Sequence, residues 1–153
     1  MKKQIAKLWI KALRSGKYKQ GQTVLRNEKD EYCCLGVLCD LYNQDCRSRK
    51  KRGLSVRKGA EPDSNLDDDL HSFSFNGETA KLPWRVQEWA GMWSNDGLMD
   101  EPQGVLTKGE RWYGETTPST ECTLAGLNDR IWGKRRSSFK QIATIIEKNV
   151  ELL

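Results

Sequence analysis

The chain has 153 residues, a net charge of +5 and hydrophobic and charged fractions of 37% and 31%, a balance typical of a globular protein with one core and a rather polar surface. No apolar run approaches the roughly 18 residues that a bilayer-spanning helix needs. The lysines near the N-terminus lie within the apolar stretch and not before it, unlike those of a secretion signal. We therefore expect a protein that is neither secreted nor membrane-spanning.

The first expected element is an amphipathic helix over residues 2–15. Its apolar side chains recur at helical spacing, with Lys and Arg on the other face: Ile5, Leu8, Trp9, Ala12 and Leu13. Ser15-Gly16 is typical of a helix end. The pattern predicts that Trp9 belongs to the core.

Residues 22–42 combine a hairpin signal with an apolar helix and carry three of the five cysteines. A β-prone run at Val24-Leu25, a polar turn at 27–31 and a return run at Tyr32-Cys33-Cys34 predict the hairpin. Helical spacing then extends over residues 35–42. A helix that starts directly after a strand directs its free N–H groups to one place, which suits an anion.

Residues 44–70 show no sustained periodicity and are rich in charge, Gly and Ser. We expect them to form a mobile insertion in a single domain that spans residues 1–153. Basic residues gather at 47–58 and acidic residues follow at 61–69. Adjacent blocks of opposite charge usually neutralise each other in solvent, and no aromatic residues are interleaved for base stacking. Nucleic-acid binding is therefore not the favoured interpretation of the positive charge.

The second half of the chain predicts further hairpins. Alternation over Ser72–Phe75, followed by the turn pair Asn76-Gly77, is the strongest hairpin signal. Residues 104–107 and 111–113 are candidates for two more short strands. Between these regions, Pro83 begins a helix that ends at Gly91.

Two helices complete the chain. Thr123 caps a short helix that ends near Asn128, and Ser138 with Gln141 forms a capping box for the last helix. The buried stripe of that helix is Phe139, Ile142, Ala143, Ile146 and Val150. Because hairpins and not crossovers join the strands, the order predicts an α+β fold, with a small antiparallel sheet from hairpins covered by about four helices.

Four blocks carry a resemblance to a known group of proteins. They are LRNEKDEYCCLGVLCDLY (25–42), LPWRVQEWAG (82–91), LAGLND (124–129) and SFKQIATIIE (138–147). In this order they resemble small accessory proteins of phages and prophages. The resemblance implies a protein that works in the cytoplasm of a bacterial host, and the group has no assigned chemistry to transfer to particular residues.

The thiols and acidic residues form no recognised catalytic or metal-binding pattern. Five cysteines, an odd number without an export signal, predict reduced thiols. Structural zinc usually needs paired Cys-x₂₋₄-Cys spacings, which these residues lack: Cys33, Cys34, Cys39, Cys46 and the only histidine, His71. His71 lies at the edge of the charged segment, away from any thiol that it would have to activate, and no Walker, GxGxxG, HExxH or GxSxG motif occurs. We predict no metal, no cofactor and no enzymatic activity.

Tryptophan and arginine gather around the middle of the chain. An aromatic ring stacked on a base contributes about 1–3 kcal/mol, and arginine binds phosphate bidentately. Asn128 and Asp129 would read a base edge or a ribose hydroxyl, although Asn128 is also an ordinary helix-end residue. The predicted ligand-binding residues are Arg26, Tyr32, Cys34, Trp84, Arg85, Arg111, Trp112, Asn128 and Asp129.

These observations favour a phage counter-defence protein. It would bind and sequester a nucleotide immune signal, ADP-ribose-derived or cyclic, without cleaving it. The first alternative is an inhibitor that binds a host protein. The others are a nucleic-acid-binding accessory protein and a nucleotide-cleaving enzyme. The sequence is compatible with a homo-oligomer.

Overall fold

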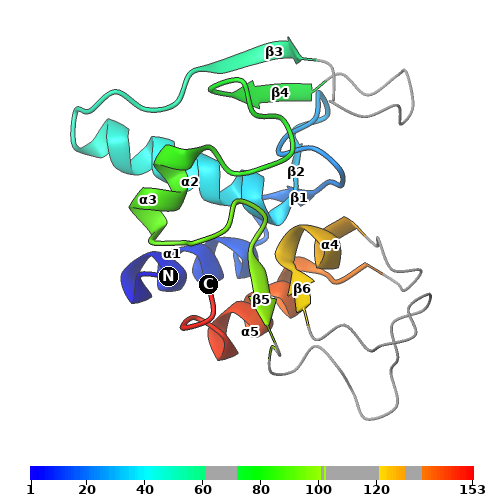
Figure 1. Cartoon of the computed structure of the whole chain (residues 1–153). Helices are drawn as coiled ribbons and strands as arrows, with labels where there is room; N and C mark the ends of the chain where they lie inside the picture. Colours follow the sequence, from blue (N-terminus) through cyan, green and yellow to red (C-terminus); the bar gives the residue numbers. More distant parts are fainter. Residues whose placement is uncertain (61–71, 101, 103–120, 130–135) are drawn as a thin grey trace.

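The computed structural model describes residues 1–60, 72–100, 102, 121–129 and 136–153. Within these residues, five helices and three two-stranded sheets form an α+β fold (Figure 1). The predicted fold class is therefore confirmed. The strands form three separate pairs and not one sheet, and a helix follows each pair along the chain. One of the three pairs is parallel.

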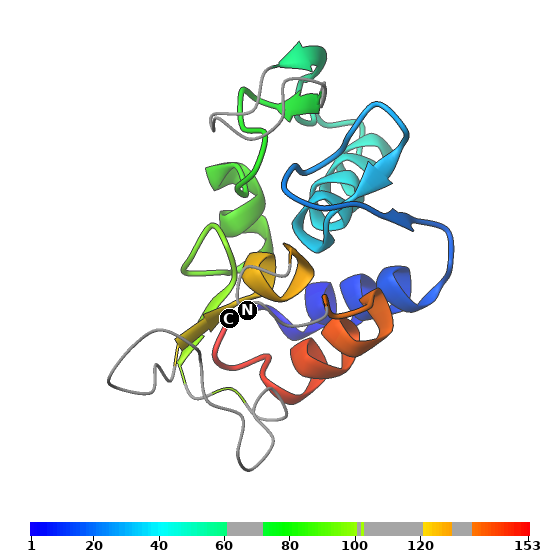
Figure 2. The same ribbon diagram turned by 90° about the vertical axis from the view of Figure 1, so that its right-hand side faces the viewer.

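Helices α1 (Lys3–Arg14) and α5 (Phe139–Lys148) lie against each other (Figure 2). Both are amphipathic, and the side chains of Trp9, Ile142 and Ile146 are fully buried. The indole Nε1 of Trp9 donates a hydrogen bond of 2.9 Å to the carbonyl of Cys34, which ties this helix pair to the next element. The predicted core position of Trp9 and the predicted capping box at the start of α5 are both confirmed.

Helix α2 (Cys34–Ser48) follows strands β1 (Lys19–Gln20) and β2 (Glu31–Tyr32), which pair in parallel. The predicted turn is present, since Arg26 and Tyr32 form an antiparallel bridge. The first turns of α2 are buried and pass very close to the preceding chain. A Cβ atom on Gly36 would lie 1.7 Å from the carbonyl oxygen of Leu25, so only glycine fits there.

Of the insertion predicted at residues 44–70, residues 61–70 lie outside the described residues, and residues 44–60 differ from the predicted loop. Helix α2 continues to Ser48, and β3 (Val56–Ala60) pairs antiparallel with β4 (Ser72–Phe75). Strand β3 was not predicted, because its residues 56–58 are exposed and show no alternation of apolar and polar side chains. Backbone pairing with β4 supplies the hydrogen bonds that the sequence pattern did not indicate.

Helix α3 (Trp84–Ala90) ends at Gly91, whose φ of 69° is the left-handed conformation expected of a helix end. Strands β5 (Leu98–Asp100) and β6 (Glu121–Thr123) then pair antiparallel, and α4 (Leu124–Asp129) follows directly. The Thr123 hydroxyl accepts a hydrogen bond of 2.9 Å from the Gly126 N–H, which confirms the predicted cap. The strands predicted at 104–107 and 111–113 lie outside the described residues.

All five cysteines are free and buried. Burial raises the pKa of the Cys33 thiol to about 12 and that of Cys122 to about 11. At neutral pH these thiols are therefore protonated and behave as small apolar side chains. In the described part of the chain, no helix combines the length and the apolar character needed to cross a membrane.

Candidate functional site

The predicted ligand-binding residues do not form one site. Arg111 and Trp112 lie outside the described residues. The other seven lie in three places: a buried junction around Asn128, a cluster around Arg26, and an exposed pair formed by Trp84 and Arg85. The chemistry of each place differs, and of the three only the Trp84–Arg85 pair is exposed.

The Asn128 junction joins the end of α4 to the start of α2 and to β1. Asn128 is fully buried, and its Oδ1 accepts hydrogen bonds from Gln20 Nε2 at 3.0 Å and from the Cys34 N–H at 3.3 Å. Its Nδ2 donates to the Gly21 carbonyl at 2.9 Å and to Asp129 Oδ1 at 2.7 Å. Because protein partners occupy the whole amide, we correct the prediction that Asn128 reads a ligand.

The start of α2 is closed in the same way. The Cys33 Sγ accepts from the Gly36 N–H at 3.4 Å, and the Cys34 N–H is held by Asn128. The Cys34 thiol itself is buried and donates to the Leu124 carbonyl at 3.4 Å. The anion site expected at this helix start is thus filled by side chains of the protein, and Cys34 is fully buried in the core.

Asp129 lies at the edge of the junction. Burial raises the pKa of its carboxyl group, while hydrogen bonds from the Asn128 side chain and the Thr23 backbone act in the opposite direction. Its backbone carbonyl accepts from Gln22 Nε2 at 3.1 Å. These partners belong to the framework of the fold, so Asp129 is a structural carboxylate in the described part of the chain.

The Arg26 cluster is a second internal contact. The guanidinium lies 4.3 Å from the centroid of the Phe73 ring and 5.4 Å from that of Tyr32. Its Nε donates a hydrogen bond of 2.7 Å to Asp30 Oδ1. The charge and the faces of the group are therefore already engaged. Arg26 and Tyr32 stabilise the turn between them and are not assigned to a ligand.

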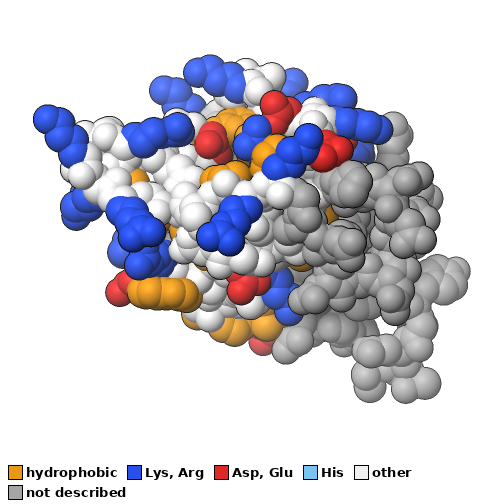
Figure 3. Space-filling view, turned by 90° about the horizontal axis from the view of Figure 1, so that it is seen from above, with side chains coloured by type: hydrophobic (Ala, Val, Ile, Leu, Met, Phe, Trp, Pro, Cys, Tyr) orange, Lys and Arg blue, Asp and Glu red, His pale blue; other side chains and the backbone are white. Residues whose placement is uncertain are grey.

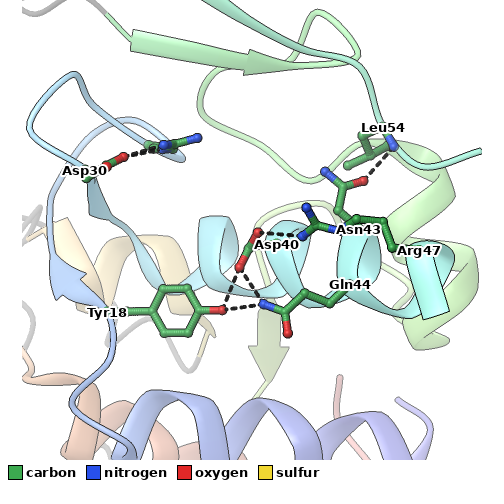
Figure 4. A network of polar contacts seen from close by, with 8 residues as sticks. Tyr18, Asp30, Asp40, Asn43, Gln44, Arg47 and Leu54 are labelled. Carbon is green, nitrogen blue, oxygen red and sulfur yellow. Dashed lines mark hydrogen bonds and ion pairs between the residues drawn. The ribbon is translucent and has the colours of Figure 1, made fainter.

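A polar network beside this cluster was not predicted. Tyr18 donates to Asp40 Oδ2 at 2.7 Å, and Gln44 Nε2 donates to the same oxygen at 2.7 Å and to the Tyr18 hydroxyl at 3.1 Å (Figure 4). Burial and the neighbouring Asp40 raise the pKa of Tyr18, so the hydroxyl remains a donor. The network fastens the segment before β1 to α2 and is structural.

The Trp84–Arg85 pair is the exposed part of the predicted set. Trp84 is 65% exposed, and the Arg85 guanidinium lies 5.7 Å from the centroid of its ring. The two residues stand between two hollows and line both. An indole that remains in water beside a cation is unusual for a core aromatic residue and is typical of a recognition surface.

The first hollow, the ribbon hollow, has a volume of about 630 Å³. The polar side chains of its lining come from the segment before β3, the β3–β4 ribbon and α3: Arg52, Ser55, Arg57, Ser74, Asn76, Glu78 and Arg85. Within the described residues, Arg52, Arg57 and Arg85 have no ion-pair partner. Lys and Arg side chains outnumber acidic ones on the face seen from above (Figure 3). The ribbon hollow therefore suits an anion.

The ribbon separates this hollow from the Arg26 cluster. Arg57 and Ser74 are cross-strand partners in the β3–β4 register and both line the hollow. The Arg26 guanidinium lies over the ring of Phe73, which directly precedes Ser74 in β4. Successive side chains of a strand point to opposite faces. Arg26 and Arg57 therefore lie on opposite faces of the β3–β4 ribbon and cannot both contact one small ligand.

The second hollow, the helix hollow, lies between α2 and α3 and has a volume of about 420 Å³. Trp89 connects the two helices that line it. Its Nε1 donates to Asp45 Oδ2 at 3.1 Å, and its ring packs edge to face against Tyr42 with the ring centroids 5.5 Å apart. Lys51 and Glu88 also line it, and neither side chain has an ion-pair partner among the described residues. The helix hollow thus offers aromatic surface, the Glu88 carboxylate and several cations: Lys2, Arg49, Lys51 and Arg85.

Sequence reasoning missed the cations that complete these hollows. Lys51, Arg52 and Arg57 were interpreted as part of a self-neutralising charged run. The proximity of Arg57 to Trp84 depends on the pairing of β3 with β4, which no local pattern showed, whereas Lys51 directly follows the end of α2. Among the described residues, no group of three His, Cys, Asp or Glu side chains is arranged to hold a metal ion.

Comparisons with known proteins concern the family and not the chemistry. The model of a family described as a domain of unknown function (DUF8296) matches residues 1–150. This range includes every helix and strand described above. No curated protein and no solved structure matches the chain.

Proposed function

The chain belongs to the DUF8296 family, and we propose that it binds a nucleotide-derived ligand at the Trp84–Arg85 pair and holds it without cleaving it. In a phage-infected bacterium the ligand would be an immune signal, ADP-ribose-derived or cyclic, which the protein withdraws from the defence system in the host cytoplasm. The resemblance to phage accessory proteins supports this setting, and the exposed pair supports the binding.

The observation that carries the proposal is the exposed indole of Trp84 beside unpaired arginines. A base stacked on an exposed tryptophan contributes about 1–3 kcal/mol. Arg85 and Arg57 line the adjoining ribbon hollow without ion-pair partners in the described chain, and guanidinium groups hold phosphate oxygens bidentately. A nucleotide combines these two features, a flat ring and a phosphate, in one molecule.

Sequestration fits the described linings better than cleavage does. The thiol that lines the helix hollow, Cys46, is only 5% exposed. The Asp45 carboxylate accepts hydrogen bonds from Arg49 and Trp89, so it is not poised to take a proton from water. Among the described residues of the two linings, no hydrogen bond joins a thiol or hydroxyl to a carboxylate such as Glu78 or Glu88, so no nucleophile is paired with a base there.

A second candidate function, binding of a host protein, is favoured by Trp93. This residue is 61% exposed, outside the linings of both hollows, and its Nε1 donates to the Leu152 carbonyl at 2.7 Å. Exposed tryptophans are enriched among the residues that dominate protein interfaces. A nucleotide at Trp84 leaves this side chain unexplained.

The test is a thermal-shift series with ADP-ribose and cyclic nucleotides on the wild-type protein, Trp84→Ala and Trp93→Ala. We expect at least one compound to raise the melting temperature of the wild type, because a ligand present at a hundredfold excess over its dissociation constant stabilises the folded state by about 2.7 kcal/mol. Trp84→Ala should lose the shift. Trp93→Ala, which removes an equally exposed indole outside the hollows, should keep it.

The same experiment separates the alternatives. Heating the complex should release the nucleotide chemically unchanged. Recovery of a cleaved product over many turnovers would replace sequestration by catalysis. Absence of any shift, together with a host protein that binds the wild type but not Trp93→Ala, would favour the second candidate function.

A further inference from the structure

We propose that the ligand has two arms, one in each hollow, joined by a phosphate linkage that Arg85 holds. This inference rests on the proposed function and names the class of nucleotide: a dinucleotide or a nucleoside diphosphate that carries a second sugar. A mononucleotide would occupy only one side of the site.

The shared wall is the first observation. Trp84 and Arg85 line the ribbon hollow and also the helix hollow. Both side chains are exposed, so a molecule can pass over them from one hollow into the other. Arg85 is the cation common to both linings, and it has no ion-pair partner among the described residues. A linking phosphate placed at the wall would therefore meet an available guanidinium.

The two hollows differ in chemistry, which is the second observation. The ribbon hollow adds Arg52 and Arg57 to Arg85 and includes Asn76 and Glu78, a set suited to phosphate and to sugar hydroxyls. The helix hollow presents the Trp89 and Tyr42 rings and the Glu88 carboxylate. Of its cations, Lys2 donates to the Glu88 and Trp89 carbonyls and Arg49 pairs with Asp45, which leaves Lys51 beside the shared Arg85. Carboxylates accept hydrogen bonds from ribose hydroxyls and from exocyclic amines. The helix hollow is therefore suited to a nucleoside.

Size is the third observation. The volumes of about 630 Å³ and 420 Å³ each lie within the range of roughly 300–1,000 Å³ typical of a site for one small ligand. One compact ligand would leave the other hollow filled with water. Two arms on one linker use both hollows, and the second arm then binds at a high effective concentration.

The experiment measures dissociation constants by calorimetry for AMP, ADP-ribose and cyclic di-AMP. At least one of the two-armed compounds should bind about 100-fold more tightly than AMP or better, since linked arms gain about 10²–10⁴ in avidity. Two variants report on the separate hollows: Arg57→Ala for the ribbon hollow and Lys51→Ala for the helix hollow. Each should weaken the two-armed compound about tenfold or more. Lys140→Ala removes an exposed cation of α5, a helix that contributes no residue to either lining, and should change nothing.

Three outcomes are informative. Weakening by both hollow variants supports the two-armed ligand. If AMP binds as tightly as the longer compounds, or if only one hollow variant weakens them, the ligand has one arm, and the proposed function stands without this inference. If none of the three nucleotides binds the folded wild-type protein, the proposed nucleotide function itself is overturned.

Discussion

The Asn128 junction and the Trp84–Arg85 pair contain residue types that bind nucleotides in other proteins, but they differ in where their partners come from. Every polar atom of the Asn128 amide has a protein partner, and the side chain is fully buried. Arg85 and the neighbouring Arg57 are exposed, without an ion-pair partner in the described chain. The difference teaches that hydrogen-bond satisfaction, and not residue type, separates framework from binding surface.

The largest expected effect is on the junction. Asn128→Ala leaves the Cys34 N–H and the Gly21 carbonyl without their buried partner and removes one of the two hydrogen bonds that Gln20 Nε2 donates. Each unsatisfied buried group costs about 1–3 kcal/mol, so we expect the free energy of unfolding to fall by about 3 kcal/mol or more in urea titration. Gln22→Ala, which removes one hydrogen bond to Asp129, is the control and should lose about 1 kcal/mol. Equal losses in the two variants would contradict the central role of Asn128.

The second prediction concerns the exposed pair. Trp84→Ala should weaken a bound nucleotide by about 5- to 150-fold, the equivalent of about 1–3 kcal/mol for one stacked base. Because the indole is 65% exposed, the free energy of unfolding should change by less than about 0.5 kcal/mol. Calorimetry and urea titration of the same sample measure both quantities. A large loss of stability would place Trp84 in the framework together with Asn128.

The Arg26 cluster is a useful third case, because it also combines an arginine with aromatic rings, but here the arginine already contacts protein partners. Arg26→Ala removes contacts with Phe73, Tyr32 and Asp30 and should cost about 1 kcal/mol of stability. Nucleotide affinity, measured by calorimetry, should remain within a factor of two (about 0.4 kcal/mol) of the wild-type value. A larger decrease would mean that a ligand reaches both faces of the β3–β4 ribbon.

The smallest effect is a pH dependence at the α1–α5 contact. Arg14 holds the pKa of Glu147 below its ordinary value of 4.5 through a hydrogen bond of 2.7 Å. Since the folded state lowers this pKa, the stabilisation is present above pH 4.5 and is lost as the pH falls through the folded-state pKa. Glu147→Gln should therefore be slightly less stable than the wild type at neutral pH and equally stable in acid. Urea titrations at both pH values would check this, and a constant difference would contradict it.

The helices could be predicted because their signals are local. The apolar stripes of α1 and α5, the Ser138 capping box and the positive φ at Gly91 all depend on residues within a few positions of each other. Strand β3 could not be predicted in the same way. Its exposed charged residues carry no alternation, and its partner β4 lies beyond a segment of unrelated composition.

The candidate site was predicted only in part, for a similar physical reason. Trp84 and Arg85 were proposed because tryptophan and arginine residues gather around the middle of the chain. Asn128 was assigned to the ligand because its partner, the Cys34 N–H, is 94 residues away. A sequence pattern shows which groups a side chain can offer, while distant contacts decide whether those groups are already occupied.

The close approach at Gly36 has a consequence for comparing or redesigning related chains. Helix propensity alone favours alanine over glycine at an interior helical position by about 1 kcal/mol, so a design that optimised α2 in isolation would replace this residue. The added methyl group would collide with the Leu25 carbonyl oxygen and push the helix away from the turn that precedes it. A glycine at this position is therefore a diagnostic marker: a distant sequence with a larger residue there cannot seat its helix against the preceding turn as this chain does.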